Sequence, residues 1–155
     1  TLFKYYQELQ NRSEVAKFIQ RPKIPPFLSE SLIVELGNRG ILESLDCSNF
    51  DLSSSNGDVV AIAPSGQVKI EVKATAQSAF QLFSKKDIEA DYLVWVHFNR
   101  YFEDEKKREI EIFILREPTK IFVESRKITL PVFIKKGGAT ITRISVNLDQ
   151  YTINS

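Results

Sequence analysis

Hydrophobic and polar residues alternate most regularly between residues 58 and 75 of the chain. Two runs, Asp58–Ala63 and Val68–Thr75, flank the segment Pro64–Gln67. Alternation of this kind is typical of strands with one buried face, and two such runs around a glycine-containing turn predict a β-hairpin. We place its two-residue turn at Ser65-Gly66, because glycine suits the positive φ angles of hairpin turns.

Helical spacing of apolar residues precedes this hairpin. It predicts a first helix over residues 2–19 and a second over 29–43, in which Ser29 serves as the N-cap. Between the two helices, Pro25-Pro26 predict an extended link. The polar residues between the second helix and the hairpin predict a loop with a short strand at 50–52.

The chain after the hairpin is expected to form one more helix, over residues 77–90, followed by strands. The apolar run Tyr92–Phe98 predicts a buried central strand. Further strands are expected at 110–115, 121–123, 129–135 and 140–146. We assign Gly137-Gly138 to the tight turn of a late hairpin. Helices, a hairpin, a helix and then strands predict a mixed α+β fold.

Length and composition fit one domain over residues 1–155, with a motif region at about 29–98 and a β-rich part at 109–146. With 43% hydrophobic and 26% charged residues, the chain can bury a hydrophobic core without needing disulfides or a structural metal. No apolar run is long enough to cross a bilayer and no secretion signal is recognised, so we expect a cytoplasmic protein. Because Cys47 and His97 are single, an internal disulfide and a Cys/His zinc site are excluded.

Charged residues of the predicted hairpin form the clearest candidate site. Side chains alternate along a strand, so Glu71 and Lys73 share one face. With the turn at Ser65-Gly66, Asp58 lies opposite Lys73 and diagonal to Glu71, within reach of a shared ion. Neighbouring carboxylates repel each other unless a cation lies between them, and hard oxygen ligands suit Mg²⁺. The alternative is an exposed hairpin face that these charges only solvate.

The pattern Asp58, then Glu71-Val72-Lys73 on the next strand, resembles the PD-(D/E)XK nuclease superfamily, which includes type II restriction enzymes and many repair and resolvase nucleases. Gly57 stands where the name-giving proline would be. The resemblance covers roughly residues 29–98. It implies a restriction endonuclease-like mixed central sheet flanked by helices. It also implies Mg²⁺-dependent hydrolysis of phosphodiester bonds in DNA, with Mn²⁺ able to substitute for Mg²⁺.

The same resemblance suggests roles for individual residues. Asp58, Glu71 and a glutamate from the preceding helix would bind the metal, and Lys73 would position or deprotonate the attacking water. We assign the helix glutamate to Glu30, with Glu35 as the fallback. The dipole of the helix would favour the ionised form of an acid in its first turn.

Residues after the hairpin are candidates for nucleic-acid contact. Gln77 and Gln81 would hold a water or a phosphate, or else lie exposed on a helix. Lys85 and Lys86 follow, where relatives contact the backbone of DNA. Taken whole, 21 basic and 20 acidic residues leave a formal charge of +1, which argues against a purely electrostatic clamp. Basic pairs of this kind are also ordinary solvated surface.

These residues predict a metal-dependent endodeoxyribonuclease whose partner is DNA. A homodimer would let so short a chain cut both strands of a duplex. The alternative is a non-catalytic nucleic-acid-binding or protein-interaction module of the same fold. Restriction, repair and junction processing are not distinguished by the residues. His97 is interpreted as a hydrogen-bonded strand residue rather than a catalytic base, and Cys47 as a small hydrophobic residue.

Overall fold

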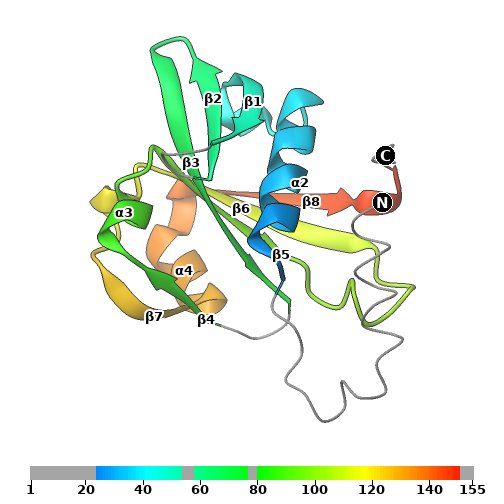
Figure 1. The fold of residues 1–155 in the computed structure, drawn as a ribbon. Coiled ribbons are helices and arrows are strands. Elements are labelled where there is room, and N and C mark those ends of the chain that lie inside the picture. Colours follow the sequence, from blue (N-terminus) through cyan, green and yellow to red (C-terminus); the bar gives the residue numbers. More distant parts are fainter. Residues whose placement is uncertain (1–23, 54–57, 77–79, 151–155) are drawn as a thin grey trace.

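A computed structural model describes residues 24–53, 58–76 and 80–150 (Figure 1). The helix predicted over 2–19 lies outside the described residues. The elements are α2 (Pro26–Asn38), β1 (Ser48–Leu52), β2 (Val59–Ala63), β3 (Gly66–Thr75), β4 (Phe80–Phe83), α3 (Lys85–Ile88), β5 (Tyr92–His97), β6 (Glu109–Arg116), β7 (Ser125–Thr129), α4 (Leu130–Gly137) and β8 (Ile141–Asn147). Short 3₁₀ turns lie at Glu43–Leu45, Pro118–Lys120, Gly138–Thr140 and Leu148–Gln150.

The described strands form a six-stranded sheet in the order β1-β2-β3-β5-β6-β8 and a separate two-stranded ribbon of β4 and β7. Strands β3 and β5 are parallel, and all other neighbours are antiparallel. The predicted mixed α+β class is therefore confirmed, with the predicted hairpin and the Tyr92–Phe98 run at the middle of the sheet.

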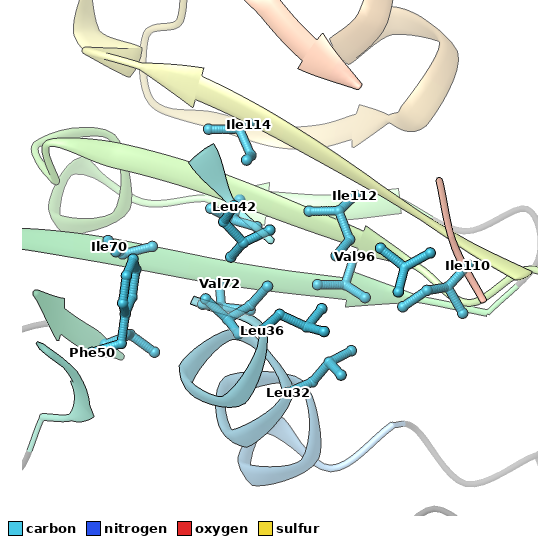
Figure 2. Packing of buried hydrophobic residues seen from close by; sticks show 14 of the residues in the cluster. Leu32, Leu36, Leu42, Phe50, Ile70, Val72, Val96, Ile110, Ile112 and Ile114 are labelled. Atoms are coloured by element: carbon cyan, nitrogen blue, oxygen red, sulfur yellow. The ribbon is translucent and has the colours of Figure 1, made fainter. Parts of the chain in front are cut away.

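One face of the sheet is covered by α2. Leu32 and Leu36 of the helix are buried against Val72 of β3, and Val96 of β5 lies in the same cluster (Figure 2). Figure 2 also places Ile110, Ile112 and Ile114 of β6 on this side of the sheet. These side chains come from every second residue of their strands, as expected for one buried face.

The opposite face of the sheet has its own apolar cluster. Leu93 and Trp95 of β5 pack there with Phe83 of β4 and Phe133 of α4. The rings of Trp95 and Phe133 lie 5.2 Å apart between centroids. Strand β5 is thus buried on both faces, which explains why its sequence is apolar without alternation.

Helix α2 begins earlier than its sequence pattern predicts. Pro26 occupies the first helical turn and is not part of an extended link. Proline is well suited to this position, because its missing N–H would have no partner there and its φ is already helical. Ser29 is not the N-cap; its buried hydroxyl donates to the Pro26 carbonyl at 3.0 Å. The helix ends at Asn38, short of the predicted residue 43.

The hairpin turn is shifted by one residue from its predicted place. Ala63 pairs with Gly66, so the two turn residues are Pro64 and Ser65 rather than Ser65-Gly66. Proline favours the second position of a turn and glycine the fourth, which this register provides. Val59 therefore pairs with Ile70. One step further along, Asp58 lies opposite Glu71, not opposite Lys73.

Two other predicted segments differ in type. The helix predicted over 77–90 is replaced, within its described part, by strand β4 and the single turn α3. The strand predicted at 129–135 is helix α4, whose N-cap is Thr129 and whose first turn contains a proline. Proline removes a ladder donor from a strand but fits the start of a helix. Residues 121–123 form no strand, and Gly137-Gly138 end α4 instead of turning a hairpin.

Candidate active site

The predicted centre of the site is brought together at the base of the β2–β3 hairpin. Asp58 lies directly before β2, and its Oδ2 accepts a hydrogen bond from the Val72 amide of β3 at 2.9 Å. Glu71 and Lys73 share the face of β3 opposite Val72, with Lys73 Nζ 3.6 Å from Glu71 Oε1. The shared face of the three residues was predicted correctly, although the register was not.

Glu30 reaches the same place from α2. Burial, the charge of Asp58 and a hydrogen bond with the Asp58 carboxyl together raise the pKa of Glu30 to about 7. The fallback residue Glu35 points elsewhere, because its carboxylate pairs with Arg39 of the same helix at 2.7 Å. Of the two predicted helix glutamates, Glu30 is therefore the one that the fold brings to the site.

Glu71 is the most constrained carboxyl group of the site. Its residue is only 7% exposed. Burial, the charges of Asp58 and Asp87, and hydrogen bonds with both of these carboxyls raise the pKa of Glu71 to about 8. Carboxyl groups that crowd together in a low-dielectric place cannot all ionise, so Glu71 holds a proton at neutral pH in the metal-free protein.

Asp87 is a site residue that the sequence prediction missed. Its Oδ2 lies 2.8 Å from Lys73 Nζ, whereas Glu71 Oε1 lies 3.6 Å from the same atom. Burial alone would raise the pKa of Asp87, but hydrogen bonds from Lys73 and from the Ser84 amide outweigh burial and lower it. Glu30, Asp58, Glu71 and Asp87 are called the carboxylate cluster below.

Local helix chemistry explains why Asp87 lies where it does. Ser84 is the N-cap of α3, and its hydroxyl accepts from the Asp87 amide at 3.2 Å. In return, the Asp87 carboxylate accepts from the Ser84 amide at 2.9 Å. A Ser followed three residues later by an acid is the signature of this reciprocal capping box. That signature, Ser84-Lys-Lys-Asp87, was available in the sequence.

The metal-binding capacity of the cluster is limited by its spacing. Among the described residues, no group of three or more His, Cys, Asp or Glu side chains is close enough together to hold a metal ion. The carboxyls interact instead as a row of neighbouring pairs, Glu30 with Asp58, Asp58 with Glu71, and Glu71 with Asp87. Two carboxylates are nevertheless what Mg²⁺ commonly takes from a protein, since water and substrate phosphate complete its six ligands. The donor chemistry of Asp58 and Glu71 fits such an ion.

The four residues predicted to contact nucleic acid differ in where they lie. Gln77 lies outside the described residues. Gln81 lies on β4, not on a helix, and its amide donates to the Ala74 carbonyl of β3 at 2.7 Å. Lys85 and Lys86 open α3 and are exposed, and Lys85 Nζ lies 3.9 Å from Glu89 Oε1.

His97 and Cys47 lie apart from this chemistry. The Nδ1 atom of His97 lies 3.1 Å from Thr75 Oγ1, which also accepts from the Trp95 indole at 2.9 Å. Burial lowers the pKa of His97, which favours the neutral form of its ring. The Cys47 thiol donates to the Leu45 carbonyl at 2.8 Å. Both residues were interpreted as structural, and each makes a hydrogen bond within the fold.

Comparisons of the chain with protein-family models, with curated proteins and with solved structures find no match. Within the part of the chain that the structure describes, no helix is long and apolar enough to cross a membrane. The function must therefore be inferred from the residues of the carboxylate cluster and their geometry.

Proposed function

We propose that this chain is a Mg²⁺-dependent endonuclease that hydrolyses phosphodiester bonds in DNA. The observation that carries the proposal is the buried Glu71 carboxyl, which contacts two further carboxyls and lies 3.6 Å from the ammonium of Lys73. Its pKa of about 8 means that ionising this buried carboxyl costs free energy. An apolar residue at this place would stabilise the sheet better, and carboxyls with strongly shifted pKa values are concentrated at functional sites.

The residues divide the chemical work between them. Asp58 and Glu71 offer oxygen ligands for Mg²⁺, with Glu30 beside Asp58. When bound, Mg²⁺ would polarise a phosphate oxygen and acidify a water molecule. The Lys73 ammonium can donate hydrogen bonds to a phosphate oxygen or to the attacking water, and it can offset charge that develops on phosphorus.

Support of a second kind comes from the motif Asp58, Glu71-Val72-Lys73, which resembles the PD-(D/E)XK superfamily. We further propose that the enzyme works in the cytoplasm, where the unpaired Cys47 stays reduced. As a homodimer, it would bring two such sites to the two strands of a duplex. DNA is the proposed partner.

Plasmid cleavage tests the proposal. Supercoiled DNA is incubated with Mg²⁺, with Mn²⁺ or with EDTA, using wild type and the variants Asp58→Asn, Glu71→Gln and Lys73→Ala. We expect nicking or linearisation by wild type in either metal and at least a hundredfold loss in each variant. Lys69→Ala is the matched control for Lys73→Ala, because Lys69 is an exposed lysine on the same strand.

A second matched pair addresses the helix glutamate. Glu30→Gln should reduce cleavage strongly, whereas Glu35→Gln should not, since only Glu30 contacts Asp58. Cleavage that persists in EDTA, or that survives loss of Glu71 and Lys73, would contradict the proposal. DNA binding without cleavage in either metal would favour the non-catalytic module.

A further inference from the structure

The ribbon of β4 and β7 has an unusual outer surface. Phe80 is 50% exposed and Leu82 is 55% exposed, although both are apolar. Their neighbours Gln81 and Phe83 point inward, as alternation along a strand requires. On the partner strand, Lys127 and Thr129 are exposed while Ile128 is buried. Phe80, Leu82, Lys127 and Thr129 are called the outer ribbon surface below.

This ribbon is attached to the candidate active site at two points. Gln81 donates to the carbonyl of Ala74, the residue that follows Lys73 on β3. At its other end, β4 leads directly into α3, whose Asp87 holds Lys73. Figure 1 shows the ribbon below α3 and beside α4. The ribbon is therefore joined to the candidate site both by a hydrogen bond to β3 and through α3.

The chemistry of the outer ribbon surface combines an aromatic ring with a cation. The Lys127 ammonium lies 5.4 Å from the centroid of the Phe80 ring. The half-exposed ring can still receive a second planar group, and the exposed Lys86 of α3, three residues after the end of β4, adds positive charge. Proteins that hold single strands combine these two features, with bases stacked on aromatic rings and phosphates beside lysines.

We propose that the outer ribbon surface binds an unpaired stretch of the DNA substrate, with a base stacked on Phe80 and a neighbouring phosphate at Lys127. The inference rests on the proposed function and names its substrate class, DNA with unpaired nucleotides near the scissile phosphate. A second copy of the chain is a poorer occupant. The exposed parts of Phe80 and Leu82 amount to only about 200 Å², whereas a stable interface needs about 800 Å² from each partner.

Binding of labelled oligodeoxynucleotides tests this inference. Fluorescence anisotropy is measured in EDTA, which prevents cleavage, with a single strand and with the matching duplex. Phe80→Ala should weaken binding of the single strand about tenfold and change duplex binding by less than about twofold. Phe80→Trp should keep the wild-type affinity, because it preserves an aromatic face. Phe27→Ala is the matched control, since Phe27 is 54% exposed but lies on α2.

The role of Lys127 is tested by the salt dependence of single-strand binding. Lys127→Gln should lower the slope of log Kd against log salt by about 0.7, the value for one phosphate contact with a single strand. Phe80→Ala should leave that slope unchanged. These two signatures separate loss of a charge from loss of a ring.

Three outcomes would overturn the inference. Phe80→Ala could weaken binding of the single strand and of the duplex equally, or Phe80→Ala and Phe27→Ala could weaken binding of the single strand equally. The third is a lower molecular mass of Phe80→Ala than of wild type in light scattering, which would mark the ribbon as a contact between copies of the chain. Failure of the proposed function is recognised separately. In that case wild type would cut no plasmid in Mg²⁺, whatever the oligonucleotide affinities are.

Discussion

Lys73 Nζ lies 2.8 Å from Asp87 Oδ2 but 3.6 Å from Glu71 Oε1. The lysine of the candidate site is therefore held most closely by a residue of the crossover between β3 and β5, not by its neighbour on β3. Only 17% of the Lys73 side chain is exposed, so water screens this pair weakly. Asp87 fixes where the ammonium points and acts as a positioning residue for it.

Asp87→Asn should lower the cleavage rate about tenfold while changing stability little. The amide oxygen of asparagine can still accept from the Ser84 amide, so the cap of α3 is kept, but the charge that holds Lys73 is lost. Cleavage rates and thermal melting report the two effects separately.

The control for that variant is Ser84→Ala. It removes the hydroxyl that accepts from the Asp87 amide and should cost about 1 kcal/mol of stability, as losses of N-caps do. The Asp87 carboxylate and Lys73 remain, so activity at low temperature should be close to wild type. Equal loss of activity in both variants would reduce the role of Asp87 to that of a helix cap.

The crowded carboxyls give stability a predictable pH dependence. Glu71 has an ordinary pKa of 4.5 and a folded pKa of about 8. Between these values the folded state keeps a proton on Glu71 that the unfolded chain has lost. The contribution of protonated Glu71 to folding stability is therefore complete below about pH 4.5 and is lost as the pH rises through 8. Glu71→Gln mimics the protonated form at every pH.

We therefore expect Glu71→Gln to be more stable than wild type at pH 9, by on the order of 2 to 4 kcal/mol, and similar to wild type at pH 5. Denaturant unfolding at both pH values, in EDTA, measures this difference. Glu35→Gln is the control, because it makes the same substitution at a carboxylate that is paired with Arg39 at the surface, outside the carboxylate cluster.

Mg²⁺ should raise the melting temperature of wild type, and more so as the pH rises from 6 to 9. Cations and protons compete for the same oxygens, and the pKa values of about 7 for Glu30 and about 8 for Glu71 set the range of this competition. Differential scanning fluorimetry with Mg²⁺, Mn²⁺ and Ca²⁺ measures it. Ca²⁺ should stabilise the fold yet support little cleavage, because its larger, looser shell fixes and acidifies water less well. Equal shifts in wild type and in a double Asp58→Asn, Glu71→Gln variant would place the metal elsewhere.

Packing of α2 on β1 predicts the effect of one small substitution. A Cβ atom on Gly37 would lie 2.5 Å from the nearest ring atom of Phe50, closer than real contacts allow. Gly37→Ala should therefore destabilise the fold by about 1 to 3 kcal/mol, despite the better helix propensity of alanine. Chemical denaturation measures the loss, and Gly40→Ala is not a suitable control because Gly40 has a φ of +76°.

A double variant provides the control for Gly37. Replacing Phe50 by alanine as well removes all three ring atoms, Cγ, Cδ1 and Cδ2, that the methyl would meet. The cost of Gly37→Ala should then be smaller in the Phe50→Ala background than in wild type. A cost that does not depend on the residue at position 50 would contradict the proposed clash.

The central part of the site could be predicted from the sequence because alternation along a strand depends only on local geometry. Asp58, Glu71 and Lys73 stay on one face whether the turn is placed correctly or one residue away, since that error shifts the register by two. Asp87 was missed for a different reason. Its contact with Lys73 depends on how the crossover folds back over β3, which no local periodicity records.

Errors in the fold were concentrated where local preference and tertiary context disagree. Residues 129–135 have the β-branched composition of a strand, but Thr129 and the proline of the first turn favour the start of a helix, and the cluster around Phe133 buries its apolar side. In the segment 77–90, Phe80, Phe83 and Ile88 have the spacing of the apolar side of a helix. Pairing with β7 instead makes the part that contains Phe80 and Phe83 a strand.

The element that holds Lys73 in place is also the shortest α-helix among the described residues. Helix α3 has four residues, too few to persist without its cap and the burial of Ile88. Brief fraying of this single turn would release the ammonium from Asp87 while β3 stays bonded to β2 and β5 on either side. Amide protons of α3 should therefore exchange with solvent long before those of β3, the strand that carries Lys73.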